Sequence, residues 1–411
     1  MMKMKKTAGF NSISKLSLAM LSLSCTHLHA AALDRAGQSI SAFLQDGNYF
    51  EASLSVIDGD ISGKARSQYS IPNTDPSTSN MADTSTYYNA AFKLQLTPHF
   101  SFGLLYDQPF GADASYQPTE NSAFSQGTAV TSADVDTQNL SFILGYQPNQ
   151  NWNFYAAPVY QTVKGNVHLN GLSFDALTGY SYQVEEDSSI GWLAGMAFQI
   201  PDIALKAAVT YRSKIKHEMT VEESFNPLVQ NAANTLGTGN TEFSTPQSVN
   251  LDLQSGIAPS TMVFLNARWV NWKDFEIKPY QFGKVTEAFT QYPGGLNLVD
   301  YSKDQISLDL GLAHKLNEQW AGVISAGWDS GAGNPASPLG PLEGYWSAGL
   351  GLQFSLAPHY FLQGGVKYFW LGDAAGHSAT YPLPGNAENA KVADYTNNNA
   401  VGYMLKIGYK F

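Results

Sequence analysis

Apolar and polar residues alternate along this chain from about residue 49 onward, in blocks of roughly ten residues, the length of a tilted strand that crosses a membrane. The block at the end of the chain is the clearest. Its alternate positions are apolar, namely Tyr403, Leu405, Ile407, Tyr409 and Phe411. A period of two predicts β-strands with two chemically different faces. The chain is therefore predicted to be all-β.

The segments between these blocks are alternately short turn signals and long polar stretches. The short signals contain Pro, Asn or Asp and lie at 97–99, 148–150, 201–202, 258–260, 317–319 and 357–359. The long stretches are 58–83, 112–133, 165–188, 218–243, 274–299, 330–344 and 373–398. Six turns and seven loops connect fourteen strands. A membrane barrel has this asymmetry, whereas a compact soluble domain rarely carries so many long loops.

Composition supports a membrane-spanning antiparallel β-barrel. Only 14% of the residues are charged and 13% are aromatic, whereas soluble domains carry about 25% charged residues. Beyond residue 30 no apolar run approaches the length of about 18 residues that a transmembrane helix needs. All eight tryptophans fall near predicted strand ends, as expected for an interfacial girdle. A large soluble β-protein is the alternative, because alternation also suits a sheet with one face in a core.

Residues 1–30 are predicted to be a signal peptide. They carry four lysines and no acid, followed by a short apolar run at 16–23 and small residues that allow cleavage after Ala30 or Ala32. Cleavage would remove Cys25, the one cysteine, and reduce 23 Lys and Arg to 19 against 34 Asp and Glu, a net charge of −15. Such acidity argues against nucleic acid as a partner. The expected location is the outer membrane of a Gram-negative bacterium.

The mature chain is predicted to divide into an N-terminal hatch at 31–48 and a barrel at 49–411. Apolar residues of the first segment follow a roughly helical spacing, namely Leu33, Ile40, Phe43 and Leu44. This segment is expected to fold inside the barrel as a plug, with a mobile periplasmic tail as the alternative.

No catalytic motif or metal-ligand spacing is present, so we expect neither an enzyme nor a cofactor. Cations are the more informative residues. Lys206, Arg212, Lys214 and Lys216 share the inward parity of the seventh predicted strand. With Lys164, the last three are predicted to bind the anionic head group of a ligand. Alternatively, these cations neutralise loop acids or touch lipopolysaccharide phosphates.

The third predicted strand ends in Gln108, Pro109, Phe110 and Gly111. Proline has no N–H for the ladder and glycine permits a bend. Together they predict a place where one strand separates from its neighbour and opens a lateral gate in the wall. The simpler interpretation is a strand terminator.

Five segments resemble one known family in their order and spacing. They are 107–113 (DQPFGAD), 160–167 (YQTVKGNV), 211–217 (YRSKIKH), 268–272 (RWVNW) and 337–341 (SPLGP). Over essentially its whole mature length the chain resembles the FadL-type outer-membrane transporters of long-chain fatty acids and aromatic hydrocarbons. The resemblance implies a monomeric barrel of fourteen strands, a hatch in the lumen and a third strand kinked inward. One departure is that 38–40 reads Gln-Ser-Ile where family members with a longer hatch carry Asn-Pro-Ala.

The hypothesis that follows is an outer-membrane transporter that takes up hydrophobic molecules, fatty acids or related hydrocarbons, by diffusion, with lateral exit at the kink. The alternative is a general hydrophilic porin, and a barrel enzyme ranks third. The expected partners are hydrophobic small molecules, outer-membrane lipid, lipopolysaccharide and the barrel assembly machinery. Phe411, which closes the apolar row of the last strand, is the predicted assembly signal.

Overall fold

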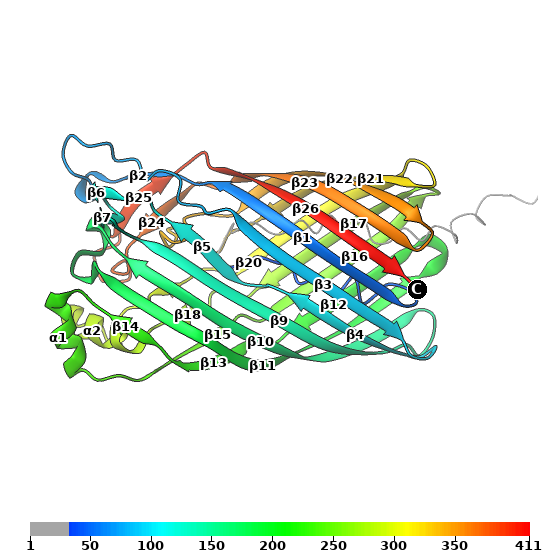
Figure 1. Cartoon of the computed structure of the whole chain (residues 1–411), viewed down its shortest axis with the longest axis horizontal. Helices are drawn as coiled ribbons and strands as arrows, with labels where there is room; N and C mark the ends of the chain where they lie inside the picture. Colours follow the sequence, from blue (N-terminus) through cyan, green and yellow to red (C-terminus); the bar gives the residue numbers. More distant parts are fainter. Residues whose placement is uncertain (1–32) are drawn as a thin grey trace, which may run out of the picture.

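The computed structural model describes residues 33–411, which form a closed antiparallel β-barrel (Figure 1). The predicted signal peptide lies outside the described residues. Fourteen strands make the wall: β1 (Tyr49–Asp60), β3 (Ser85–Gln95), β4 (Phe100–Asp107), β9 (Ser132–Tyr146), β10 (Trp152–Leu169), β11 (Tyr180–Ile200), β12 (Leu205–Arg212), β16 (Ser248–Ala258), β17 (Thr261–Val270), β20 (Gln305–Lys315), β21 (Trp320–Asp329), β22 (Tyr345–Ala357), β23 (Tyr360–Leu371) and β26 (Asn399–Lys410).

The barrel closes where the last strand pairs with the first. β26 and β1 are in register from Tyr49↔Lys410 to Asp60↔Asn399, along the full length of both strands. The six short turns lie at the end that carries the C-terminus, and the long loops lie at the opposite end (Figure 1). The predicted fold class and strand number are confirmed. Short turns face the periplasm in barrels of this kind.

Alternation along the strands places apolar side chains on the outside and polar ones within. On β20 the exposed fractions of Leu308 and Leu310 are 40% and 58%, while Ser307 and Asp309 between them are buried. No helix among residues 33–411 has both the length and the apolar character needed to cross a membrane. The outward apolar row instead provides the surface that lipid chains contact.

The loops fold into small sheets and helices of their own. They contain β2 (Gly63–Ala65), β5 (Gly111–Ser115), β6 (Thr119–Asn121), β7 (Ser125–Gly127), β8 (Ala129–Val130), β13 (Ile215–Thr220), β14 (Glu222–Ser224), β15 (Asn240–Thr245), β18 (Glu276–Ile277), β19 (Val299–Asp300), β24 (Ala374–His377), β25 (Lys391–Tyr395), α1 (Pro227–Thr235) and α2 (Tyr280–Thr290). β5 joins the main sheet through β9, and β14 joins it through β11. The two helices lie at the loop end of the barrel (Figure 1).

The loop predicted at 165–188 is wrong in its extent. β10 runs on to Leu169 and β11 begins at Tyr180, with pairing that continues from Gly165↔Val184 after a register shift. Strands can extend past the membrane because ladder hydrogen bonds do not depend on lipid. Val167 is buried inside this extension and stabilises it by packing.

The N-terminal segment lies inside the barrel, where its apolar side chains are buried. Ile40, Phe43 and Leu44 have exposed fractions of 0%, 1% and 5%. Phe43 packs edge-on against Tyr155 of β10, with the ring centroids 5.8 Å apart. The segment forms turns instead of the expected helix, because side chains of the wall bind its backbone carbonyls, which leaves fewer of them free to accept helical hydrogen bonds.

Candidate ligand-binding site

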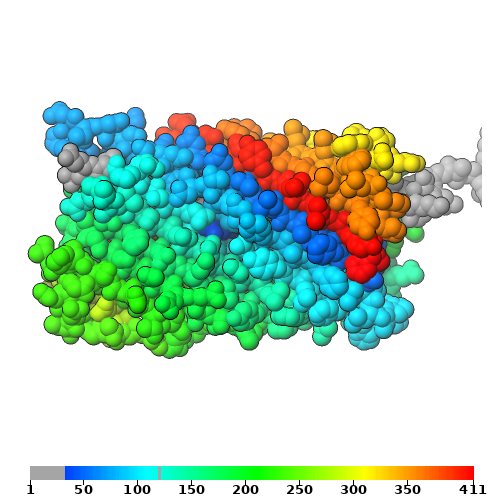
Figure 2. Space-filling view, in the orientation of Figure 1, coloured from blue at the N-terminus to red at the C-terminus, as the bar shows by residue number. Residues whose placement is uncertain are grey.

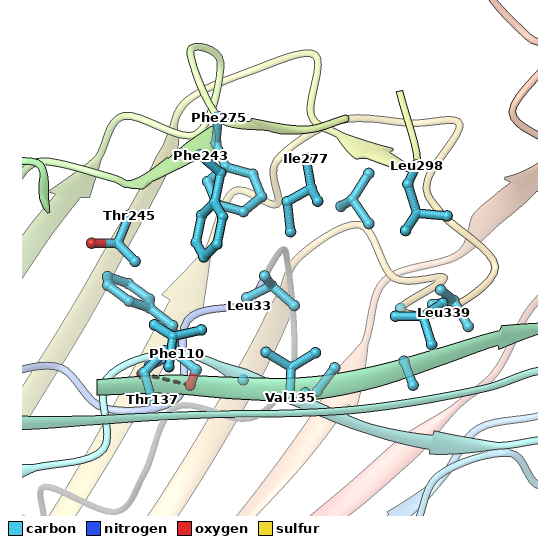
Figure 3. Close-up of a pocket in the computed structure, with 18 of the residues that line it drawn as sticks. Leu33, Phe110, Val135, Thr137, Phe243, Thr245, Phe275, Ile277, Leu298 and Leu339 are labelled. Atoms are coloured by element: carbon cyan, nitrogen blue, oxygen red, sulfur yellow. Dashed lines mark hydrogen bonds between the residues drawn. The ribbon is translucent and has the colours of Figure 1, made fainter. Parts of the chain in front are cut away.

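An apolar cavity of about 80 Å³ lies between the hatch, the wall and the extracellular loops (Figure 3). Phe243, Phe275 and Ile277 border it on one side, while Phe110 and Val135 lie across from them. The remaining apolar lining comes from the hatch, from β10 and β11 and from loops, namely Leu33, Val163, Val167, Tyr182, Val184, Trp272, Leu298, Val299, Tyr301 and Leu339. An engineered apolar cavity of about 150 Å³ stays dry and binds benzene. This cavity has about half that volume, so its lining would have to move apart to take a single aromatic ring.

Trp272 is the centre of an aromatic cluster around this cavity. It is fully buried and lies edge-on to Phe110, Phe275 and Tyr301 at centroid distances of 5.5, 5.1 and 5.1 Å. Its indole N–H donates to Oε1 of Gln305 at 2.7 Å. Because that polar group is already satisfied, the ring offers the cavity an apolar surface.

Charge is nearly absent from the lining. Lys164 is the one charged residue among the residues that border the cavity, and its ammonium lies 3.6 Å from a carboxylate oxygen of Asp136. Burial raises the pKa of Tyr301 above its ordinary range, and Asp300 adds to this rise, so that phenol stays neutral. The cavity therefore suits an uncharged molecule, since a buried carboxylate without a partner is strongly disfavoured.

The kink borders this cavity directly. β4 ends at Asp107, and the next strand, β5, pairs with β9 and not with β3. β3 pairs with β4 only from Ala90 to Gln95, so this ladder stops short of the upper half of β3. Phe110 lies between the two strands and points into the cavity, where its backbone bonds to Thr137 (Figure 3).

The hatch supplies the hydrogen bonds that the kinked strand lacks. The carbonyl of Pro109 accepts the backbone N–H groups of Arg35 at 2.8 Å and Ala36 at 3.3 Å, and the N–H of Gly111 donates to Leu33 at 2.9 Å. A deep-blue area of the N-terminal segment is visible between the blue and cyan strands of this wall (Figure 2). The hatch thus lies directly behind the gap between β3 and β5.

Arg35 spans that gap. Its guanidinium forms ion pairs with Asp113 on β5 at 2.9 Å and Asp136 on β9 at 3.1 Å, and it lies 5.2 Å from the ring centroid of Tyr87 on β3. The side chain is 2% exposed. One hatch residue therefore contacts β3, β5 and β9.

Below the apolar cavity the hatch is held by polar contacts. Asp34 is buried and pairs with Arg268 of β17 at 2.9 Å. Gln38 bonds to both Arg268 and Arg212, each at 3.0 Å. A second cavity of about 110 Å³ lies here, and its lining includes Gln38, Arg268 and Asp252. An apolar ligand would meet buried charges on this path.

The four cations predicted to bind a head group do not form one column. Lys164 borders the apolar cavity, whereas Arg212 points into the lumen, where it donates to the carbonyl of Gln38 in the hatch. Lys214 and Lys216 are exposed on the outside. The prediction that Lys214 and Lys216 share the inward face of Lys206 and Arg212 is wrong, because β12 ends at Arg212 and β13 starts at Ile215, which shifts the alternation by one residue.

Several cavity residues were not predicted from the sequence. Trp272 was expected in the interfacial girdle but is fully buried. Phe243 lies on the short loop strand β15, and Phe275 and Tyr301 lie on extracellular segments outside any strand. The density of aromatic residues at 269–275 is the one signal in the sequence that could have drawn attention to this region.

The sequence matches the family model described as outer membrane protein transport protein (OMPP1/FadL/TodX) over residues 12–321. It is 21% identical to the long-chain fatty acid transport protein of Salmonella typhi over 301 residues. That alignment covers 66% of this chain and 65% of the relative, so the chain spans just under two thirds of the curated relative's length.

Solved structures with the same fold include two toluene transporters. The P. putida protein TodX superimposes with a TM-score of 0.60 at 13% identity, covering 89% of this chain and 90% of that one. The Ralstonia pickettii protein TbuX gives a TM-score of 0.58 at 12% identity, covering 98% of each chain. At this identity the likeness concerns the fold.

Proposed function

Because the chain belongs to the OMPP1/FadL/TodX family of outer membrane transport proteins, we propose that it carries uncharged hydrocarbons across the outer membrane and releases them sideways at the kink. The family consists of outer-membrane channels for hydrophobic compounds in Gram-negative bacteria, not of enzymes. The observation that carries the proposal is the apolar, aromatic cavity that ends at the kink.

Energetics favour an uncharged ligand in this cavity. Each buried CH₂ group contributes about 0.8 kcal/mol, and an edge-to-face contact with an aromatic ring adds roughly 0.5–1.5 kcal/mol. Burying a carboxylate without a partner costs more than several such groups contribute. A monoaromatic hydrocarbon therefore gains from contact with Trp272 and Phe110 without losing a charged group's hydration.

The surroundings of the cavity support lateral release. Phe110, Gly111 and Ala112 of the kinked segment border the cavity, whereas the path toward the periplasm crosses the buried pair Asp34–Arg268. An apolar molecule loses little on moving past the kink into lipid. It would have to separate charged groups to pass the hatch.

A fatty acid is the second candidate, because Lys164 borders the cavity and could bind a carboxylate if its contact with Asp136 were exchanged. Uptake of radiolabelled toluene and oleate by cells with and without the protein separates the candidates. We expect loss of toluene uptake on deletion and normal toluene uptake in a Lys164→Met variant. Selective loss of oleate uptake in that variant would favour the fatty acid.

Closing the gap tests lateral release. Oε1 of Gln108 accepts the backbone N–H of Tyr88 at 2.8 Å across the opening. A Tyr88→Cys/Gln108→Cys variant bridged by a short thiol-specific cross-linker that forms disulfides is expected to lose uptake and to recover it after reduction, while each single cysteine treated alike transports normally. Full uptake by the bridged protein would refute lateral exit.

A further inference from the structure

The outer rim of the barrel carries a groove of about 330 Å³ between β15 and the segment Asn271–Glu276. Its lining is polar and includes Lys214, Lys216, Glu242, Asp274 and Glu276. Aromatic residues stand near the extracellular ends of the two strands that precede its walls in the sequence, namely Tyr211 on β12 and Trp269 on β17. Aromatic residues in such positions mark the membrane interface, so the groove is at the level of lipid head groups.

This groove and the apolar cavity share part of their walls. Phe243, Thr245, Pro246 and Phe275 border both of them. The two phenylalanine rings meet edge-on, with their centroids 6.4 Å apart. A thin aromatic partition therefore separates the outside of the barrel from the cavity, on the side that faces Phe110 and the kink (Figure 3).

The backbone is open at this place. Within residues 33–411, β13 and β15 pair only with each other. The ladder between β16 and β17 ends at Ser248↔Val270, and Pro246 has no N–H with which to continue it. The edge of β15 that faces Asn271–Glu276 thus has no strand partner that would seal the wall.

Buried polar bonds hold this hairpin against the wall. Nδ1 of His217 lies 2.7 Å from Asp187, and its Nε2 lies 3.0 Å from Oε1 of Gln161. The same Gln161 oxygen accepts the hydroxyl of Thr245 at 2.8 Å. These bonds fix the hairpin against β10 and β11, so the passable edge is the one at the groove.

We propose that the rim groove is the entrance through which an uncharged hydrocarbon reaches the cavity, passing between Phe243 and Phe275. This inference rests on the proposed function. The charges of the groove largely compensate one another, with Lys216 and Glu242 paired at 2.8 Å, so they offer no strong site for an anionic head group. The ligand would cross the barrel sideways, from the groove to the kink.

A thiol label placed in the groove tests this route. Ser244 borders the groove but not the cavity, and the sequence has no cysteine other than Cys25 of the predicted signal peptide. A Ser244→Cys variant is labelled on intact cells with a bulky, membrane-impermeant maleimide after it has folded. We expect labelling to lower the initial rate of toluene uptake about tenfold, the effect of ~1.4 kcal/mol on the barrier.

Ser67→Cys is the matched control, because Ser67 is exposed on a different extracellular loop. Its label should leave uptake unchanged. Unchanged uptake by fully labelled Ser244→Cys protein would refute the proposal that the groove is the entrance. If unlabelled cells already take up toluene no faster than deletion cells, the proposed function fails instead.

Binding kinetics distinguish a blocked entrance from a distorted cavity. Toluene binding to the purified, labelled Ser244→Cys protein is followed by tryptophan fluorescence, to which Trp272 in the cavity contributes. A blocked entrance should slow association about tenfold and leave the Kd within about twofold, since the cavity contacts are retained. A weaker Kd with an unchanged association rate would refute the entrance.

Discussion

At Gly111 the hatch, β5 and β9 lie so close together that a side chain has no room. A Cβ added there would lie 2.1 Å from Cζ of Arg35 and 2.3 Å from the carbonyl oxygen of Val135. The backbone of β9 cannot yield without breaking the pairing of β5. We expect Gly111→Ala to destabilise the fold by about 1–3 kcal/mol, the usual effect of overpacking.

Thermal unfolding of the purified barrel, followed by its electrophoretic mobility, measures this effect. Gly340→Ala is the control, since a Cβ at Gly340 meets nothing within 4 Å and both glycines border the same cavity. Equal stability of the two variants would show that β5 moves freely. The close contact would then not hold the kink in place.

Arg35 is expected to keep the lateral opening closed at rest. Replacing it by Ala removes contacts with Asp113, Asp136 and Tyr87 that link β3 to β5 and β9. The two carboxylates keep partial access to water, with side chains 25% and 32% exposed, so the loss of stability should be about 2 kcal/mol. Arg35→Ala is therefore predicted to raise the toluene uptake rate of cells.

Arg66→Ala provides the comparison for this prediction. Arg66 pairs with Asp394 at 2.8 Å in the extracellular loops, away from the kink. Its removal should leave uptake as in the wild type. A slower rate in Arg35→Ala would indicate that Arg35 holds the exit open instead of closing it.

At the scale of elements, the alternation of residues and the spacing of turns were enough to predict fourteen strands. Both signals are local, since side-chain parity and turn chemistry depend on neighbours in the chain. A break in the alternation cannot be predicted from neighbours in the chain alone. The shift at Ser213 and Lys214, which turns Lys216 outward and His217 inward, depends on contacts with β11, so a strand pattern read straight through residues 205–217 misplaces both side chains.

The candidate site was less predictable, because it also depends on residues that are distant in the chain. Proline and glycine at 109 and 111 indicated a kink, because their backbone limits are intrinsic. The cavity beside the kink needs Phe243, Trp272, Phe275 and loop residues far apart in the chain. Their convergence follows from closure of the barrel and has no local signature.

The last strand is followed by an exposed aromatic residue. Phe411 follows β26, stacks on Tyr409 with centroids 5.2 Å apart and lies 6.2 Å from the ring of Phe92 on β3. Its ring is 47% exposed, so it contributes little to the interior. Deletion of Phe411 is expected to leave unassembled protein whose electrophoretic mobility does not change on heating, because the terminal aromatic residue of the outward row would no longer be present for the assembly machinery.

Lys410→Ala is a suitable control for the deletion, since it alters the neighbouring position and keeps the aromatic row. Surface display and heat-dependent mobility of both variants give the answer. Normal assembly of the truncated chain would mean that Phe411 is not an assembly signal.

At the scale of the whole molecule, the interior has two layers of opposite character. Aromatic and aliphatic side chains surround the upper cavity, while the lower layer pairs hatch groups with charged residues of the wall. Arg212 and Arg268 bind Gln38 there, and Lys93 and Lys206 donate to the carbonyls of Gln45 and Leu44. The hatch thus supplies hydrogen-bond acceptors to four inward-facing cations of the wall.

Deleting residues 33–45 tests whether these pairings keep the channel dry. Arg268 would lose Asp34, and Lys93 and Lys206 would lose their carbonyl acceptors. A buried charge that loses its partner is strongly disfavoured, so water should enter the lumen. The variant is expected to conduct ions steadily in planar bilayers, as a hydrophilic porin does, while the intact protein does not.

Shortening the exposed loop at 72–77 is the matched control, because it removes chain without touching the lumen. It should remain non-conducting. If the variant without its hatch is also closed, the inward side chains of the wall seal the barrel unaided. The hatch would then serve the kink, through Pro109 and Gly111, and not the permeability barrier.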